Sequence, residues 1–527
     1  MRRPHIVLRE RTGGFMKKKH MEILGLTLSL LFLGGCAEIE PEIESFLDSL
    51  GEDGQETAIR YQKLSAVFDK MGKGMGLAIV MIEPEDLEEN QEIEYYPAVA
   101  EYAVDMEIDG ETYISRETDE NAVHVFGEAQ VVLKNAEISR IAKDSGEEGD
   151  LSAYGVGAAM LTTSGTSYLK NNTITTRAER GTGIFAYGDG TTYAVNTTIN
   201  TKRDSSKGIQ AAKGGTVYGW NLKAGTEGND SPAVRSDSRG SSLILDGGTY
   251  STKGMDSPAV YSAGNTVIHG GYLAAEQWEA ICMKGNQSLS LYDCDVSGNK
   301  ADDISNDCTW NVILYQNGAG GFTKGKSTFE MNGGTLTARN GGLFYTTNVD
   351  SAITLSNVKI TYPAVNGFFL RCTGNNNQRE WGKSGANGAD CLFTAVNQDM
   401  IGDVIWDSIS RLDFYMSEGS VLRGAVRQEE NYAGSGGEGH CNLYIGEGCT
   451  WIVTGNSTLG RLSCQGTIVD DEGNAVMVHG KDQTLYMQGN SKYTVAVDTF
   501  ETQANMSGAS QPTQWMDHQV EIPQEMQ

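Results

Sequence analysis

Hydrophobic and polar residues alternate in short runs along most of the chain, and these runs recur at a nearly constant interval. In the segment 191–195, Thr192 and Ala194 fall on one face of a strand, and the residues between them fall on the other. Gly, Asn and Asp separate such runs, as is typical of tight turns between strands. The pattern therefore predicts many short strands rather than helices.

An aliphatic residue opens each of five successive units, at intervals of 25, 25, 26 and 21 residues: Ile184, Ile209, Val234, Val260 and Ile281. Each unit holds three short strands, which leaves no room for a βαβ unit of ~30 residues with its helix. It matches one coil of a parallel β-helix, which buries its inward residues against the neighbouring coils. We expect an all-β, right-handed parallel β-helix of roughly a dozen coils, with the five aliphatics stacked in a ladder.

The N-terminus carries an export signal. Basic residues Lys17–Lys19 precede an apolar run from Ile23 to Leu33, and small residues follow it, as in a signal peptide. The ending Leu-Gly-Gly-Cys resembles the bacterial lipobox, in which cleavage precedes the cysteine and its sulfur carries a diacylglycerol. This resemblance implies that Cys36 attaches the mature protein to membrane lipid at the outer face of a bacterial membrane. Because residues 1–15 add a second charged stretch, we expect translation to start at Met16.

The remaining composition divides the chain into segments. We expect a signal peptide at 1–35, the lipidated cysteine with an acidic spacer at 36–58, a small N-terminal cap at 59–102, the β-helix at 103–498 and a polar C-terminal tail at 499–527. The tail is rich in Gln, Ser and Thr, so we expect it to fray.

Several short motifs resemble a group of right-handed β-helix surface proteins of gut Firmicutes and related bacteria, described as adhesin-like. The segments that carry the resemblance are Asp119–Val125, Ser257–Val260, Asn311–Gln316, Trp381–Gly388, Gly402–Ile409 and Trp515–Pro523. The resemblance covers about residues 105–525. It implies the fold and a place on the cell surface, and it assigns no activity to any residue.

The charge balance excludes one class of partner. The chain has 41 Lys and Arg against 69 Asp and Glu, a formal net charge of −28. Nucleic-acid binding requires basic patches that neutralise phosphates, so we expect no nucleic acid. The acidity is typical of a soluble extracellular surface.

Polysaccharide lyases and pectin hydrolases share the β-helix fold, so the chain must be compared with them. Asp293 and Asp295 fall on one strand face near Asp302 and Asp303, where a lyase would place calcium ligands, but in so acidic a chain the pattern favours turn and surface carboxylates. The Arg-x-Pro-x-x-Arg element of pectate lyases is absent, and the polygalacturonase motifs occur only as fragments. An extracellular polysaccharide lyase or glycoside hydrolase therefore remains an alternative to a binding protein.

The segment 374–388 interrupts a coil and is the best candidate ligand site. It carries Trp381 and Arg379 with Asn376, Asn377 and Lys383 on a Gly-rich frame. Indole and amide groups suit sugar stacking and hydroxyl recognition. The alternative is a packed lid. Outward tyrosines offer a second candidate surface, or ordinary stacking: Tyr187, Tyr193, Tyr218, Tyr261, Tyr315 and Tyr345.

Cysteine spacing indicates either disulfides or buried thiols. Cys372 and Cys391 flank the same segment, where a disulfide would staple it, and buried thiols at inward positions are the alternative. No CxxC or Cys/His pattern suggests zinc, so we expect no metal and no cofactor. Together these features predict a non-catalytic surface lipoprotein that presents a face to a host or bacterial glycan or protein. The alternatives are a β-helix enzyme and a structural envelope spacer.

Overall fold

The computed structural model describes residues 93, 95–142, 151–237, 240–318, 326–363 and 367–527. The predicted signal peptide, Met16, Cys36, the acidic spacer and most of the cap segment lie outside these residues. Within them, no helix is long and apolar enough to cross a bilayer.

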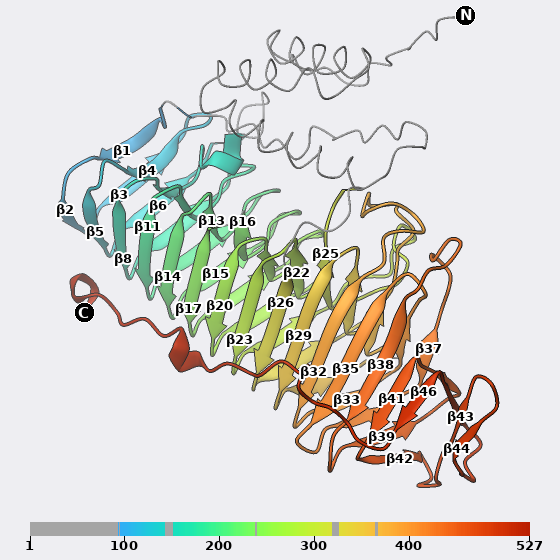
Figure 1. Ribbon diagram of the computed structural model, residues 1–527. Coiled ribbons are helices and arrows are strands. Elements are labelled where there is room, and N and C mark those ends of the chain that lie inside the picture. The colour runs from blue at the N-terminus through green and yellow to red at the C-terminus, as the bar shows by residue number, and fades with distance from the viewer. Residues whose placement is uncertain (1–92, 94, 143–150, 238–239, 319–325, 364–366) are drawn as a thin grey trace, which may run out of the picture. The chain divides into compact units, whose positions relative to one another are not determined.

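The described chain winds into a parallel β-helix whose coils each give one strand to each side (Figure 1). Three long sheets form these sides, with thirteen strands in sheet A, fifteen in sheet B and ten in sheet C. The thirteen strands of sheet A agree with the predicted number of coils.

Sheet A contains β1 (Ala98–Tyr102), β4 (Asn121–Val125), β7 (Met160–Thr162), β10 (Ile184–Tyr187), β13 (Ile209–Ala212), β16 (Val234–Asp237), β19 (Val260–Ser262), β22 (Ile281–Lys284), β25 (Val312–Tyr315), β28 (Phe344–Thr347), β31 (Leu370–Cys372), β34 (Val404–Trp406) and β37 (Val426–Gln428).

Sheet B contains β2 (Met106–Asp109), β5 (Gln130–Lys134), β8 (Thr166–Lys170), β11 (Thr191–Val195), β14 (Thr216–Trp220), β17 (Ser242–Asp246), β20 (Asn265–His269), β23 (Ser288–Tyr292), β26 (Ser327–Asn332), β29 (Asp350–Ser356), β32 (Asp390–Val396), β35 (Arg411–Ser417), β38 (His440–Ile445), β41 (Arg461–Cys464) and β46 (Thr499–Glu501).

Sheet C contains β3 (Thr112–Ser115), β6 (Glu137–Arg140), β9 (Thr173–Thr176), β12 (Thr198–Thr201), β15 (Lys223–Thr226), β18 (Thr249–Thr252), β21 (Tyr272–Ala275), β24 (Asp295–Gly298), β27 (Thr335–Ala338) and β30 (Lys359–Thr361). Three short 3-10 helices lie outside the sheets: η2 (Leu151–Tyr154), η3 (Trp515–Asp517) and η4 (Gln524–Met526).

Two smaller sheets complete the C-terminal coils. Sheet D contains β33 (Asp399–Ile401), β36 (Val421–Arg423), β39 (Thr450–Val453) and β42 (Thr467–Asp470). Sheet E contains β40 (Ser457–Thr458), β45 (Thr494–Val497), β43 (Met477–Gly480) and β44 (Leu485–Met487), and its β43 and β44 pair antiparallel. The antiparallel pair ends the parallel stacking at this end of the molecule.

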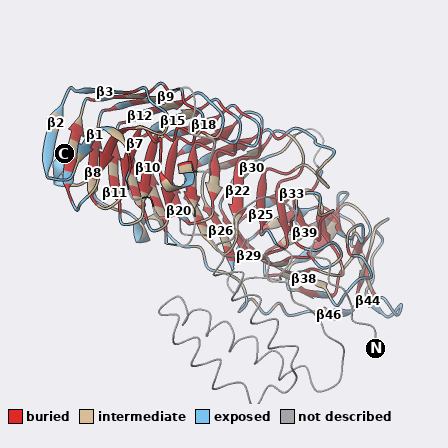
Figure 2. Cartoon of the chain, turned by 90° about the horizontal axis from the view of Figure 1, so that it is seen from above, coloured by how far each residue is buried: buried red, intermediate tan, exposed pale blue. Residues whose placement is uncertain are grey.

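The predicted aliphatic ladder is confirmed in sheet A. Ile184 pairs with Ile209, which pairs with Val234, and the row continues through Val260 to Ile281. All five side chains are fully buried. Figure 2 shows the buried residues concentrated along the strands, with exposed residues mainly in the turns. Each inward side chain thus packs against the residue one coil away.

Asparagines in left-handed backbone form the corner between sheets B and C. Asn196 and Asn221 have φ angles of 48° and 51°, and Asn221 Nδ2 donates to Asn196 Oδ1 at 2.8 Å. Asn tolerates positive φ better than most residues with a side chain, and its amide can bond the next coil. The corner is therefore both sharp and tied from coil to coil.

The structure differs from the predicted segment boundaries at both ends. Strand β1 pairs with β4, so the β-helix includes Ala98–Tyr102, which lies within the predicted cap segment. Strand β46 pairs with β41 beyond the expected end at 498. The prediction of a fraying tail is wrong: residues 502–527 return along sheet B toward the N-terminal coils (Figure 1). Side-chain contacts, described below, hold this segment.

Candidate functional site

Segment 374–388, between β31 and β32, folds over the outer face of sheet A. The Trp381 ring lies 4.4 Å from the Tyr315 ring and 5.9 Å from the Trp310 ring, between centroids, and the residue is only 9% exposed. The Trp381 carbonyl accepts hydrogen bonds from the side chains of Asn375 and Asn387, at 3.0 and 3.1 Å. The alternative of a packed lid therefore describes most of this segment.

A cavity of about 150 Å³ remains beside the lid. Three indoles line it, from Trp278, Trp310 and Trp381, and we call it the indole cleft. Sheet A contributes Arg235 and Tyr261 to its wall. The cleft thus combines aromatic faces with charged groups at one place on the β-helix.

Arg379 is the predicted site residue whose charged group lies nearest the indoles of the cleft. Its guanidinium carbon lies 5.7 Å from the Trp381 ring centre and 5.8 Å from that of Trp278. Its Nε donates to Asn306 Oδ1 at 2.6 Å, and a terminal nitrogen lies 3.7 Å from an Asp303 carboxylate oxygen. These contacts fix the planar group near two indoles at the cleft.

A buried ion pair lies behind the wall of the cleft, to which Glu279 contributes. Lys300 Nζ donates to Glu279 Oε2 at 2.8 Å, and the side chains are 0% and 5% exposed. The ammonium lies over the Trp278 ring and 4.7 Å from the centre of the Trp310 ring. Burial raises the pKa of Glu279 and lowers that of Lys300, because it penalises the charged form of both groups.

Sequence reasoning missed this pair. Glu279 and Lys300 are 21 positions apart, which equals the spacing from Val260 to Ile281. Opposite charges separated by about one coil length were the available signal.

Arg235 forms the wall on the N-terminal side. It points outward from β16, and its guanidinium carbon lies 4.5 Å above the Tyr261 ring on the next strand. Its Nε donates to Asp237 Oδ2 at 2.7 Å, and that oxygen also accepts from Gln210 Nε2 at 2.8 Å. Asp237 is two residues further along the same strand, so the alternation of the strand places both side chains on its outer face.

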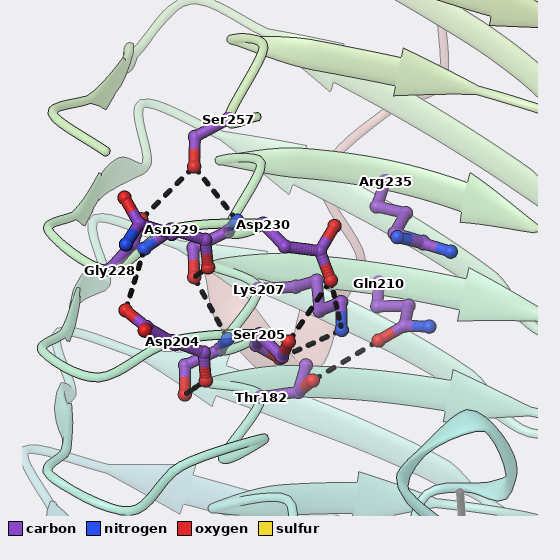
Figure 3. Close-up of polar contacts among 12 residues, drawn as sticks. Thr182, Asp204, Ser205, Lys207, Gln210, Gly228, Asn229, Asp230, Arg235 and Ser257 are labelled. Atoms are coloured by element: carbon purple, nitrogen blue, oxygen red, sulfur yellow. Dashed lines mark hydrogen bonds and ion pairs between the residues drawn. The ribbon is translucent and has the colours of Figure 1, made fainter. Parts of the chain in front are cut away.

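Turns that precede the strands of sheet A stack from coil to coil, and Figure 3 shows the polar contacts between them. Ser205 Oγ donates to Asp230 Oδ2 at 3.0 Å, and Lys207 Nζ lies 4.0 Å from the same oxygen. Asp230 and Asp256 occupy equivalent turn positions with φ angles of 47° and 52°, and both line the cleft. Two carboxylates from successive turns therefore line the cleft.

The other predicted ligand residues serve the turn or lie outside the cleft. The Asn376 backbone N–H donates to both carboxylate oxygens of Asp307, at 3.0 and 3.2 Å. Asn377 adopts a φ of 57°, and its N–H donates to Asn375 Oδ1 at 2.9 Å. Lys383 is exposed and is not part of the cleft wall. Of the five candidates, only Trp381 and Arg379 line the indole cleft.

Cys372 and Cys391 are free thiols in the structure. Both are buried in the interior, and Cys372 Sγ contacts the carbonyl oxygens of Ala389 and Arg411 at 3.8 and 3.6 Å. Burial raises the pKa of the Cys372 thiol well above its usual value. The structure thus shows the buried-thiol alternative rather than a stapled segment.

The predicted tyrosine surface is divided between two sheets. Tyr193 and Tyr218 stack on sheet B with ring centres 4.9 Å apart, while Tyr261 and Tyr315 line the indole cleft on sheet A. Tyr345, also on sheet A, is covered. These tyrosines do not form one continuous face.

The carboxylates considered for lyase chemistry take part in local contacts. Asp295 accepts from Thr335 Oγ1 and Asp302 accepts from Thr309 Oγ1, each at 2.7 Å. Asp303 accepts from the Ser305 N–H at 2.8 Å. Among the described residues, no group of three or more His, Cys, Asp or Glu is arranged to hold a metal ion.

Comparison with known proteins does not assign the chain to a family: no protein-family model matches it, and no curated protein matches it either. The arguments about function therefore rest on the sequence and on the geometry of the indole cleft.

Proposed function

We propose that the chain is a lipid-anchored, adhesin-like surface protein without catalytic activity, and that it binds one sugar ring of a glycan in the indole cleft. The observation that carries this proposal is the Arg379 guanidinium, which lies within 6 Å of two indoles beside an open cavity. Indoles combine an apolar face with a polar edge, and Arg offers a planar fork of donors to paired oxygens. Typical small-molecule pockets measure ~300–1,000 Å³, so this smaller cavity suits a single ring.

The charge balance of the cleft favours a neutral glycan. The two cations that line it, Arg235 and Arg379, are paired with Asp237 and Asp303, and the lining Glu279 is paired with the buried Lys300 behind the wall. Asp230 and Asp256 add two further carboxylates to its lining. An anionic sugar would find no surplus of positive charge to attract it and would be repelled by these two carboxylates. A neutral sugar meets no such repulsion.

The location is supported by the sequence. The lipobox-like Leu-Gly-Gly-Cys36 and the acidic spacer after it would tether the β-helix to the outer face of a bacterial membrane. We expect Cys36→Ala to remove lipid attachment and to shift the protein out of the membrane fraction, as measured by metabolic labelling with a fatty acid and by fractionation. Labelling that persists in the variant would contradict the anchor.

A glycan array followed by calorimetry tests the binding site. We expect wild-type protein to bind neutral glycans, and Arg379→Ala to weaken binding at least tenfold. Lys383→Ala is the matched control, because it removes a cation from the same segment outside the cleft. Equal loss in both variants would contradict the assignment of the site.

The same preparation separates the alternatives. A reducing-sugar and unsaturated-product assay on each bound polysaccharide tests for an enzyme, and turnover would overturn the non-catalytic proposal. An envelope spacer predicts no saturable ligand, so an array without any binding would favour that role.

A further inference from the structure

We call residues 502–527 the strap. It crosses the outer face of sheet B from the C-terminal coils back toward the N-terminal coils (Figure 1). Its contacts begin just after β41, where Gln465 Nε2 donates to Gln503 Oε1 at 3.1 Å, and continue at β32, where the Ser510 N–H donates to Thr394 Oγ1 at 3.0 Å. They end at β8, where Lys170 Nζ donates to the Gln527 carbonyl oxygen at 2.8 Å. The strap therefore touches strands that belong to many different coils.

Thr513 forms the central anchor. Glu330 on β26 accepts from its N–H at 2.5 Å and from its hydroxyl at 2.8 Å. Its carbonyl oxygen accepts from Asn332 Nδ2 at 3.0 Å, and its hydroxyl also lies 2.6 Å from the Tyr292 hydroxyl. The backbone N–H, the carbonyl and the hydroxyl of Thr513 each have a partner on sheet B, so the fit is specific.

Trp515 forms the second anchor. Its ring stacks on His269, with centroids 4.7 Å apart and planes within 7°. The position of His269 is in turn fixed by Asp246, whose Oδ1 lies 2.7 Å from His269 Nδ1. Tyr292 flanks the indole at 6.2 Å.

Met526 forms the last anchor. It is 2% exposed and packs into an apolar cluster with Tyr168, Val195 and Trp220, which come from three successive strands of sheet B. Val520 and Ile522 cover the same cluster from the strap side. Burying an apolar Met side chain in such a cluster is favourable, so this end acts as a latch.

We propose that the outer face of sheet B from β8 to β26 is a peptide-docking surface, and that the strap is its ligand, latched by Met526. After β46 the strap contains no strand among its described residues and joins no sheet. The hydrogen bonds that hold it on sheet B each involve a side chain of the strap or of the sheet, and they do not continue the backbone ladder of the preceding coil. In a solenoid each coil contacts only its neighbours, so such a ligand also couples coils that do not contact one another directly.

The test uses the intact, folded chain. A protease recognition site is inserted between Asn505 and Met506, where Asn505 is exposed, and the folded protein is then cleaved. We expect fragment 506–527 to co-elute with the β-helix in size-exclusion chromatography, and a synthetic peptide of the same residues to displace it. Circular dichroism before cleavage checks that each variant is folded.

Two methionines in the strap provide matched variants. Met526→Asp places a charge in the apolar cluster, and we expect it to weaken retention of the fragment at least tenfold. Met516→Asp makes the same change at a side chain that is 83% exposed, and we expect retention to match that of the unsubstituted protein.

Three results would overturn the proposal. The first is release of the unsubstituted fragment on cleavage, and the second is equal retention in both variants. The third is a dimer of the intact protein that Met526→Asp dissociates, because the strap would then dock on a second copy. None of these outcomes depends on glycan binding, so this test is independent of the proposed function.

Discussion

Lys300 Nζ and Glu279 Oε2 lie 2.8 Å apart beneath the indole cleft, with neither side chain more than 5% exposed. The pair gives the wall of the cleft a neutral, rigid backing, because each charge is compensated by the other. A buried ion pair contributes little net stability, but the loss of one partner leaves an uncompensated charge. Replacing one of the two residues should therefore destabilise the cleft more than replacing both.

We expect Lys300→Met to lower the free energy of unfolding by ~3–5 kcal/mol, because Glu279 is left buried without its cation. Chemical denaturation followed by tryptophan fluorescence measures the change. The double variant with Glu279→Leu restores most of the loss if the penalty arises from the stranded carboxylate. A double variant as unstable as the single one would contradict this explanation.

The β-helix should lose stability in mild acid through His124. This side chain is buried on β4, stacks on Phe126 with ring centres 4.7 Å apart and lies 2.9 Å from Thr163 Oγ1. Burial lowers the pKa of His124 to about 4, against an opposing electrostatic effect of Glu101. An unfolded chain binds that proton near pH 6.5, so the folded state is favoured fully above about 6.5 and loses up to about 3 kcal/mol as the pH falls to about 4.

His124→Gln isolates this contribution from the many carboxylates. We expect the difference in unfolding free energy between wild type and variant to change between pH 7 and pH 4, with the wild type declining more steeply. Parallel pH curves for the two proteins would show that His124 is not the titrating group.

The coils can be predicted from the sequence because the buried aliphatic positions recur at the length of one coil. Ile184 and Ile209 repeat at the coil length, and each needs only its neighbour to form the ladder. The strap lacks such a signal: Thr513 meets Glu330 across 183 positions, and its polar composition resembles that of a fraying terminus. Contacts that a repeat does not generate cannot be deduced from the repeat.

The candidate site was predicted only in part for a related reason. Trp381 and Arg379 stand out by residue type, and both reach the indole cleft. Asn376 and Asn377 have side chains suited to ligands, but here they build the turn. Residue type indicates what a side chain can bind, whereas the path of segment 374–388 decides what it does bind.

The last prediction concerns the asparagine corner. Asn221 has a φ of 51° and donates to Asn196 on the neighbouring coil. Asn221→Gly keeps the left-handed backbone without strain and loses the side-chain hydrogen bond, so we expect a decrease in the free energy of unfolding of ~1 kcal/mol or less. Asn221→Val forces a β-branched residue into that backbone, and we expect a further loss of ~1–3 kcal/mol. Urea denaturation of the two variants and the wild type separates these effects, and equal stability of Gly and Val at this position would show that the backbone of the corner relaxes.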